Sequence, residues 1–225
     1  MNRISKTILT LAIATTLSSL NIACQKITKV ETLNTRAVEK VAQKDYQGAL
    51  TDYNKAIEQN PNDATLYNNR GNAHFQAKNY EEAIKDYNQA IKINPQMADT
   101  YYNRAYARQQ LKDFKGAIAD YNKALEFATN ENTQIKIYGN RATLHYEVKN
   151  YQNAIADYAQ VIKLKPDIPQ IYSNRARLYY QQGNLEQAIA DYRQAADLYQ
   201  QQGNTQSQQE LLAIVSKIEK VGNRE

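Results

Sequence analysis

The sequence predicts an all-α protein built as a solenoid of repeated helix pairs, and three observations support this. A short sequence block recurs along the chain at nearly constant spacing. Apolar residues inside each block return every three to four positions, which indicates amphipathic helices. The 225 residues include only 7 Gly and 4 Pro, which argues against turn-rich β folds and glycine-rich phosphate loops.

Five copies of the block form the second helix, helix B, of each predicted unit. They cover residues 45–57, 79–91, 113–125, 150–162 and 184–196, and their first aromatic or apolar positions are 34, 34, 37 and 34 residues apart. A second block precedes each copy and predicts helix A, at residues 34–44, 68–78, 102–112, 139–149 and 173–183. The three extra residues fall in the polar segment 129–134, which we predict to be a loop.

This pattern resembles the tetratricopeptide repeat, and the second unit carries the family signature at Tyr67, Gly71, Tyr80, Ala83, Tyr87, Ala90 and Pro95. The resemblance covers roughly residues 30–202 and implies a right-handed superhelical solenoid of five helix pairs. The implied repeats are residues 30–61, 64–97, 98–131, 135–168 and 169–202. The amphipathic segment 205–221 is predicted to be a capping helix that covers the apolar end of the stack.

The first 24 residues resemble an export signal that ends in a bacterial lipidation site. Arg3 and Lys6 precede an apolar core that ends just before Cys24, the only cysteine. We predict a signal peptide at residues 1–23, a lipid such as palmitate on Cys24, a linker at 24–29, and membrane anchoring in a bacterial cell envelope. The alternatives are a periplasmic or secreted protein, a retained anchor, or a chain that is not exported, because Asn21 departs from the usual lipoprotein pattern.

The composition offers little for catalysis, metal binding or nucleic-acid binding. The formal net charge of +5 is partly carried by the leader, and the remaining balance does not favour nucleic acid or an anionic surface as partner. His74 and His145 are the only histidines, and we interpret both as packing residues. The motifs of zinc proteases, phosphate loops and serine hydrolases do not occur. We therefore expect a chain that is not an enzyme and that uses no cofactor or metal.

Two charged positions recur in every unit. Helix A carries Arg36, Arg70, Arg104, Arg141 and Arg175, and helix B carries Asp52, Asp86, Asp120, Asp157 and Asp191. A guanidinium fits a carboxylate at a helix–helix contact. We interpret these rows as structural ion pairs, and the alternative is a row of arginines that faces a ligand.

An asparagine precedes four of these arginines, and the family resemblance implies that this position faces the inner, concave surface. The implied groove residues are Asn69, Asn72, Tyr102, Asn103, Tyr106, Asn140, Tyr146, Asn174, Arg177 and Tyr180, with Asn68 and Phe75 also on the inner face. A carboxamide can donate to a peptide carbonyl and accept from a peptide N–H, and tyrosine adds stacking area. The alternative is that asparagine is merely tolerated at these positions.

The predicted function is a non-catalytic scaffold that binds a peptide or partner protein in its concave groove. The alternatives are an envelope assembly factor resembling the repeat lipoproteins of outer-membrane or pilus biogenesis, and a regulatory arm of an enzyme. Binding of a chaperone tail is not expected, because Asn68 and Asn140 stand where that family clamp needs cations. An acidic tail would then lose its hydration against neutral amides, which is unfavourable.

Overall fold

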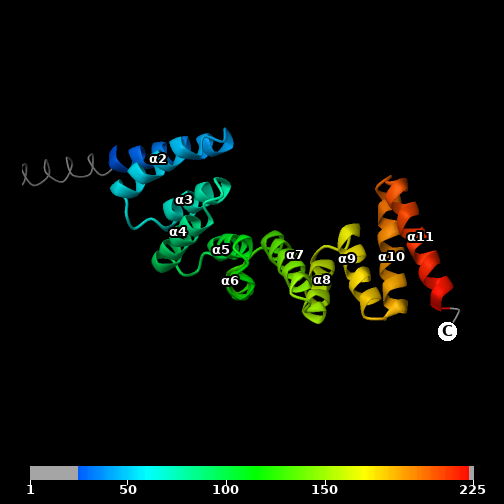
Figure 1. Ribbon diagram of the computed structural model, residues 1–225. Helices are drawn as coiled ribbons and strands as arrows, with labels where there is room; N and C mark the ends of the chain where they lie inside the picture. The colour runs from blue at the N-terminus through cyan, green and yellow to red at the C-terminus, as the bar shows by residue number, and fades with distance from the viewer. Residues whose placement is uncertain (1–24, 223–225) are drawn as a thin grey trace, which may run out of the picture. The chain divides into compact units, whose positions relative to one another are not determined.

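The computed structural model describes residues 25–222, with side chains through residue 220, and this range folds entirely into helices joined by short turns (Figure 1). A first helix covers residues 25–42. It is followed by α2 (Tyr46–Gln59), α3 (Ala64–Gln76), α4 (Tyr80–Ile93), α5 (Ala98–Gln110), α6 (Phe114–Phe127), α7 (Glu131–Glu147), α8 (Tyr151–Leu164), α9 (Pro169–Gln181), α10 (Leu185–Gln201) and α11 (Thr205–Gly222). The predicted all-α class is confirmed. The predicted signal peptide and Cys24 lie outside the described residues.

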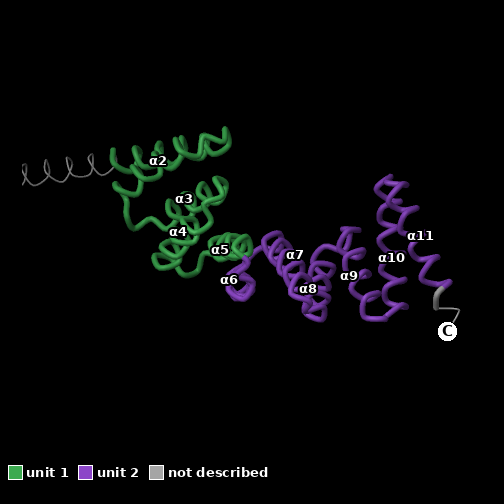
Figure 2. Tube along the Cα trace, in the orientation of Figure 1, with its two compact units in different colours: residues 1–111 green, residues 112–225 purple. Residues whose placement is uncertain are grey.

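The chain divides into two compact units, Met1–Leu111 and Lys112–Glu225 (Figure 2). Unit 1 contains the first helix and α2 to α5, and unit 2 contains α6 to α11. Within each unit, every helix from α2 onward packs against the next helix of that unit. In unit 1, α3 also contacts α5, so two A helices meet directly. This serial packing of neighbouring helices is the arrangement that the repeat predicts.

Local capping chemistry sets the helix boundaries. The Asp45 and Asp113 side chains accept hydrogen bonds from N–H groups three residues on, at 2.9 Å, and so cap the B helices that follow. Helices A end in the left-handed conformation, with φ between +60° and +63° at Lys44, Lys78, Lys112 and Lys149. Gly183 takes this position in the fifth unit, with φ +77°. The left-handed residue turns the chain tightly from helix A into helix B.

Small residues allow helices A and B to approach closely. The predicted contact residues Ala83, Ala117 and Ala154 are all 0% exposed. In the second repeat, Ala83 packs in one cluster with Tyr87, which is 1% exposed. A Cβ atom added to Gly71 would lie 2.6 Å from a ring carbon of Tyr87. The small position of helix A is thus a packing requirement that glycine meets here.

Two predicted boundaries differ from the structure. Residues 131–134, predicted as a loop, are helical, because Asn130 Oδ1 accepts a hydrogen bond from the Thr133 N–H at 2.8 Å and caps α7. The three extra residues therefore lengthen α7, which begins before the predicted repeat boundary at 135. Residues 25–29, predicted as a linker, continue the first helix.

The C-terminal helix α11 covers the end of unit 2, as the sequence predicts. Leu211, Val215 and Ile218 belong to one buried cluster with residues of α10. The outer face of α11 still exposes Leu212 and Ile214, so this cap is only partly polar. Among the described residues, none of the helices combines the length and the apolar character that a membrane span requires.

Candidate functional site

The recurring arginines form structural links between three helices. Nε and Nη2 of Arg70 donate to the two carboxylate oxygens of Asp86 at 2.8 and 2.6 Å, and Nη1 donates to Asn54 Oδ1 at 2.7 Å. Asn54 lies on α2, Arg70 on α3 and Asp86 on α4. The same bidentate contact joins Arg36 with Asp52, Arg141 with Asp157 and Arg175 with Asp191. Because these guanidinium groups are held by their own repeats, the structural interpretation of the pairs is supported.

The first of these pairs is strengthened by a second cation. Hydrogen bonds from Arg36 and Lys40 lower the pKa of Asp52 to about 2, although burial of the carboxyl group acts in the opposite direction. Lys40 Nζ lies 2.7 Å from Asp52 Oδ2. The carboxylate therefore stays ionised throughout the neutral range and keeps the pair intact.

Both histidines lie beside these ion pairs. His74 Nε2 is 4.0 Å from Asp86 Oδ2, and His145 Nε2 is 4.0 Å from Asp157 Oδ2. Burial lowers the pKa of both imidazoles, so both are neutral at pH 7. Their Nδ1 atoms are buried without a hydrogen-bond partner. Among residues 25–220, His, Cys, Asp and Glu form no cluster of three that would suit a metal ion, and the packing role assigned to the histidines fits this geometry.

In unit 1, the asparagines of the predicted row bond to asparagines outside the row. Asn69 Nδ2 donates to Asn34 Oδ1 at 3.1 Å, and Asn103 Nδ2 donates to Asn68 Oδ1 at 3.2 Å. Thr100 Oγ1 also donates to Asn68 Oδ1, at 3.1 Å. Asn68, which was expected on the inner face, is 8% exposed. Asn68 therefore joins α3 to α5, because its buried side-chain oxygen accepts both hydrogen bonds from residues of α5.

Asn69 and Asn103 keep part of their hydrogen-bonding capacity. Each carboxamide has two N–H donors and an oxygen with two lone pairs, and Asn69 and Asn103 are half-buried. Asn72 Oδ1 accepts a hydrogen bond from the buried Tyr87 hydroxyl at 2.8 Å. In unit 2, Asn140 and Asn174 are half-buried on α7 and α9.

Three aromatic rings from three helices form a cluster in unit 1. The ring centroid of Phe75, at the end of α3, lies 5.3 Å from that of Tyr80 at the start of α4. It also lies 5.2 Å from the ring of Tyr106 on α5, and Tyr106 is 40% exposed. We call Phe75, Tyr80 and Tyr106 the unit 1 platform. Tyr102, also on α5, is half-buried.

Unit 2 carries a cluster at the same repeat positions. The ring centroids of Tyr146 and Tyr151 are 5.9 Å apart, and the guanidinium carbon of Arg177 lies 5.0 Å from the Tyr146 centroid. We call Tyr146, Tyr151 and Arg177 the unit 2 platform. Tyr180, one turn further along α9, is 49% exposed.

Sequence reasoning missed one member of each platform. Tyr80 and Tyr151 begin helices B, and their periodicity assigned them to the apolar core stripe. Each lies five residues after the aromatic residue of the preceding helix A, Phe75 or Tyr146. A tight turn brings residues at that separation together, and this spacing is the signal that would have identified both platforms.

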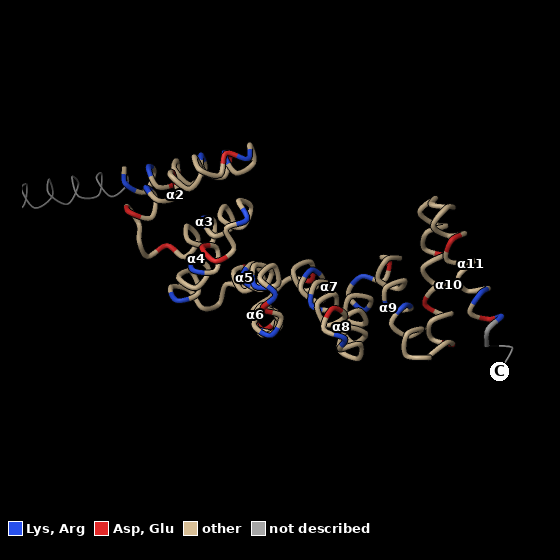
Figure 3. The backbone as a smooth tube through the Cα atoms, viewed as in Figure 1, with Lys and Arg blue, Asp and Glu red and all other residues tan. Residues whose placement is uncertain are grey.

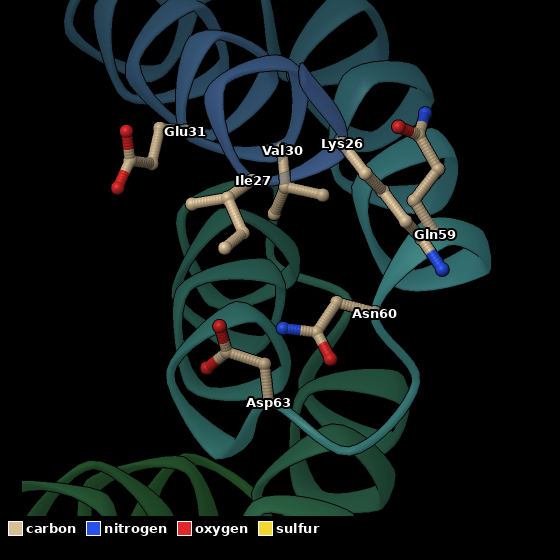
Figure 4. Close-up of a pocket in the computed structure, with 7 residues that line it drawn as sticks. All are labelled: Lys26, Ile27, Val30, Glu31, Gln59, Asn60 and Asp63. Atoms are coloured by element: carbon tan, nitrogen blue, oxygen red, sulfur yellow. The ribbon is translucent and has the colours of Figure 1, made fainter. Parts of the chain in front are cut away.

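A separate pocket lies at the N-terminal end of unit 1, where the first helix extends over the turn between α2 and α3. It has a volume of about 330 Å³ and is lined by Lys26, Ile27, Val30, Glu31, Gln59, Asn60 and Asp63. Ile27 and Val30 point toward Asn60 and Asp63 (Figure 4). Aliphatic, amide, cationic and anionic groups all line this space, so its chemistry does not favour one class of ligand.

Charged side chains are interspersed over the described helices. Both units carry basic and acidic residues, although Asp and Glu are absent from α3 and α9 (Figure 3). Such a surface gives no strong long-range field. The platforms are therefore the more distinctive surface features.

Family models of the tetratricopeptide repeat match most of the described chain. One model, described as tetratricopeptide repeat, matches residues 64–97 and 98–130, and a second with this description matches residues 140–203. A third, described as TPR repeat, matches residues 39–78. The matches to residues 64–97 and 98–130 coincide with the helix pairs α3–α4 and α5–α6. The chain belongs to the tetratricopeptide repeat family.

Solved structures of other tetratricopeptide repeat proteins share this fold at low sequence identity. MamA is similar with a TM-score of 0.68 and 19% identity, over 74% of this chain and 96% of that chain. YrrB, described as a TPR protein with an unusual peptide-binding site, has a TM-score of 0.63 and 21% identity, over 79% and 90% of the two chains. Pseudomonas aeruginosa PilF has a TM-score of 0.66 and 12% identity, over 86% and 93%. No curated protein sequence matches the chain.

In this tetratricopeptide repeat protein, each platform combines packing residues with one exposed residue. Phe75, Tyr146 and Tyr151 pack against buried clusters, and the position of Tyr80 is aromatic or apolar in every repeat. The framework is made by the Arg–Asp pairs, the small residues and the buried tyrosines such as Tyr87. By contrast, Tyr106 and Tyr180 present large, rigid rings to solvent. Such rings are suited to contact a partner, since they combine apolar area with a hydroxyl group and few rotatable bonds.

Proposed function

We propose that this tetratricopeptide repeat protein is a non-catalytic scaffold that binds extended segments of a partner protein at the platform of each unit. The observation that carries the proposal is the repetition of a partly exposed ring cluster at equivalent positions in both units. The exposed member of each platform, Tyr106 in unit 1 and Arg177 in unit 2, lies outside the buried core, which favours a binding role for that position.

The physical chemistry of the platforms suits a peptide. Clustered aromatic rings lose little conformational entropy on binding and offer a large contact area, which is why such residues dominate the binding energy of many interfaces. The partly free carboxamides of Asn69 and Asn103 lie on the same A helices as Phe75 and Tyr106. They can add hydrogen bonds to a peptide backbone, each with a net value of about 0.5–1.5 kcal/mol.

Two solved relatives support the proposal through their own ligands. YrrB is described as having a peptide-binding site. The first TPR of Spaghetti (RPAP3), which has a TM-score of 0.51 and 24% identity and covers 54% of this chain and 94% of that chain, is bound to an HSP90 peptide. In the present chain, the burial of Asn68 between α3 and α5 supports the expectation that a chaperone tail is not the ligand.

The test is capture of a partner from detergent-solubilised membranes with the full chain as bait, followed by calorimetric titration of that partner. Tyr106→Ala and Tyr180→Ala should each weaken binding roughly 5- to 30-fold, as expected for truncated interface tyrosines. Leu212→Ala is the matched control, because Leu212 is also a large exposed residue but lies on the capping helix. Equal affinity of all three variants and the unaltered chain would place the binding site elsewhere.

We further propose that the scaffold acts in a bacterial cell envelope, held to a membrane by a lipid on Cys24. The support comes from the leader sequence alone, in which the apolar core ends just before the only cysteine. Cys24→Ala should abolish fatty-acid labelling and release the protein from the membrane fraction. An intact Met1 N-terminus on the protein isolated from cells would refute the anchor. A narrower role in outer-membrane or pilus assembly stays a prediction, since the likeness to PilF at 12% identity concerns the fold.

A further inference from the structure

One repeat position differs sharply in chemistry between the two platforms. The residue directly after the small residue of helix A is Asn72, Tyr106, Thr143 and Arg177 in the second to fifth repeats. In unit 1, Tyr106 completes an all-aromatic platform. In unit 2, Arg177 takes the corresponding place over the ring of Tyr146. The two platforms therefore present an uncharged and a cationic surface.

The environment of Arg177 differs from that of the framework arginines. Arg175, two residues earlier on α9, donates from Nε and Nη2 to Asp191 at 2.7 and 2.8 Å. Arg177 is exposed, and within residues 25–220 it forms neither a hydrogen bond nor an ion pair. Its guanidinium carbon lies 5.0 Å from the ring centroid of Tyr146. Its N–H donors are therefore available to a ligand, while the ring contact restrains the side chain.

The charge of Arg177 also acts on a phenol of the next helix. Burial raises the pKa of Tyr192 on α10, and the charge of Arg177 opposes that rise, as expected for a cation close to the phenol. The exposed Tyr180 on α9 also influences Tyr192. Arg177 thus packs over the ring of Tyr146 on α7, and its charge acts to lower the pKa of Tyr192 on α10, against the larger effect of burial.

We propose that Arg177 is the position at which unit 2 recognises an acidic side chain, Asp or Glu, within the bound peptide. This inference rests on the proposed function, because it assigns the chemistry of the partner at one of the two platforms. A guanidinium presents paired N–H donors that match the two oxygens of a carboxylate. Stacking on Tyr146 holds the side chain in place before the ligand arrives, which reduces the entropy lost on binding.

The geometry favours a single carboxylate over a more highly charged ligand. The other cation of this part of α9, Arg175, is already neutralised by Asp191. A phosphate group or a dense acidic tail needs several cations in one place, whereas one guanidinium balances one carboxylate. The unit 1 platform, with Tyr106 in the equivalent position, should accept an apolar, aromatic or proline side chain instead.

A selection experiment tests this assignment with a peptide library in place of the natural partner. The full chain, kept in mild detergent, is used to select binders from a random twelve-residue peptide library displayed on phage. The variants Arg177→Gln and Lys163→Gln are used in parallel selections. Lys163→Gln is the matched control, because Lys163 is an exposed cation of unit 2 that lies on α8, outside the platform.

We expect peptides selected by the unaltered chain and by Lys163→Gln to be enriched in Asp or Glu at a fixed position, and this enrichment to disappear with Arg177→Gln. A synthetic version of a selected peptide should lose roughly five- to twentyfold in affinity when its acidic residue is replaced by the amide. It should lose as much with Arg177→Gln, and both losses should shrink in high salt.

Three other outcomes of the selection would each contradict a specific part of the proposal. Binders without an acidic preference, or binders that are indifferent to Arg177→Gln, would overturn the assignment of Arg177 and leave the scaffold function in place. Synthetic peptides with a free and with an amidated C-terminus separate a side-chain carboxylate from the terminal one. If only the peptide with the free C-terminus binds, Arg177 recognises the terminal carboxylate and not an Asp or Glu side chain. Failure to select any binder with the unaltered chain would count against the scaffold function itself.

Discussion

The hydrogen bonds that the side-chain oxygen of Asn68 accepts can be used to measure how much the asparagines of unit 1 contribute to the free energy of unfolding. Asn68 Oδ1 is buried and accepts two hydrogen bonds from α5, one from Thr100 Oγ1 at 3.1 Å and one from Asn103 Nδ2 at 3.2 Å. Asn103→Ala removes one donor and leaves the oxygen with the other. We expect a loss of about 0.5–1.5 kcal/mol in the free energy of unfolding, the usual net value of one hydrogen bond.

The double variant should show a larger, non-additive effect. Thr100→Val keeps the shape of the side chain and removes the second donor, so it should cost about 0.5–1.5 kcal/mol alone. With both donors removed, a buried carbonyl oxygen is left unsatisfied, which adds a desolvation penalty of about 1–3 kcal/mol. The coupling between the two sites should therefore be destabilising and of about 1 kcal/mol or more.

The assay is urea denaturation of the four proteins of this mutant cycle, followed by circular dichroism at 222 nm and fitted over the first transition. Asn174→Ala serves as a control, because Asn174 occupies the equivalent repeat position in unit 2 and is only half-buried. Strictly additive losses, or an Asn103→Ala variant as stable as the parent, would refute this link between α3 and α5. An Asn103→Ala variant as stable as the parent would leave Asn103 free for a partner, as the sequence alone predicts.

Three further predictions concern the framework. Lys78→Gly should raise the free energy of unfolding by about 0.5–1 kcal/mol, because glycine adopts φ +63° without strain, and Gly183→Lys should lower it by a similar amount in the same denaturation assay. Melting temperature should fall between pH 7.5 and 5.5, because burial lowers the folded-state pKa of His145 and the unfolded chain binds protons first; His145→Gln should reduce this fall. Gly71→Ala should lower stability by about 1 kcal/mol, since overlap with the Tyr87 ring outweighs the gain in helix propensity; a higher melting temperature would contradict this.

Much of the fold could be predicted from the sequence because its determinants recur at fixed spacing. Buried alanines such as Ala83, the arginines of helix A and the aspartates of helix B each occupy one site per repeat, so every copy supports the interpretation of the others. The boundary near residue 131 could not be predicted in this way. It depends on a single local event, the capping of α7 by Asn130, in a segment whose polar composition is typical of a loop.

The candidate site was less predictable, because similar asparagines have different surroundings. Asn68 and Asn69 are neighbours in sequence, yet the first is buried against α5 and the second remains half-exposed. Which of the two faces a partner depends on the side chains that the next A helix supplies, here Thr100 and Asn103. A periodic pattern identifies the helix face but not these cross-helix contacts.

Comparison of the repeats with one another separates framework from binding surface. A position that must support the same helix contact in every repeat is restricted to one kind of residue, as the arginines of helix A and the aspartates of helix B are. A position without a shared helix contact carries no such restriction, and the residue directly after the small residue varies from Asn72 to Tyr106, Thr143 and Arg177. Variation within one chain, on a surface with clustered rings, is expected where each repeat contacts a different part of a partner. The specificity of the scaffold should therefore lie in the residues that differ between repeats, and its stability in those that do not.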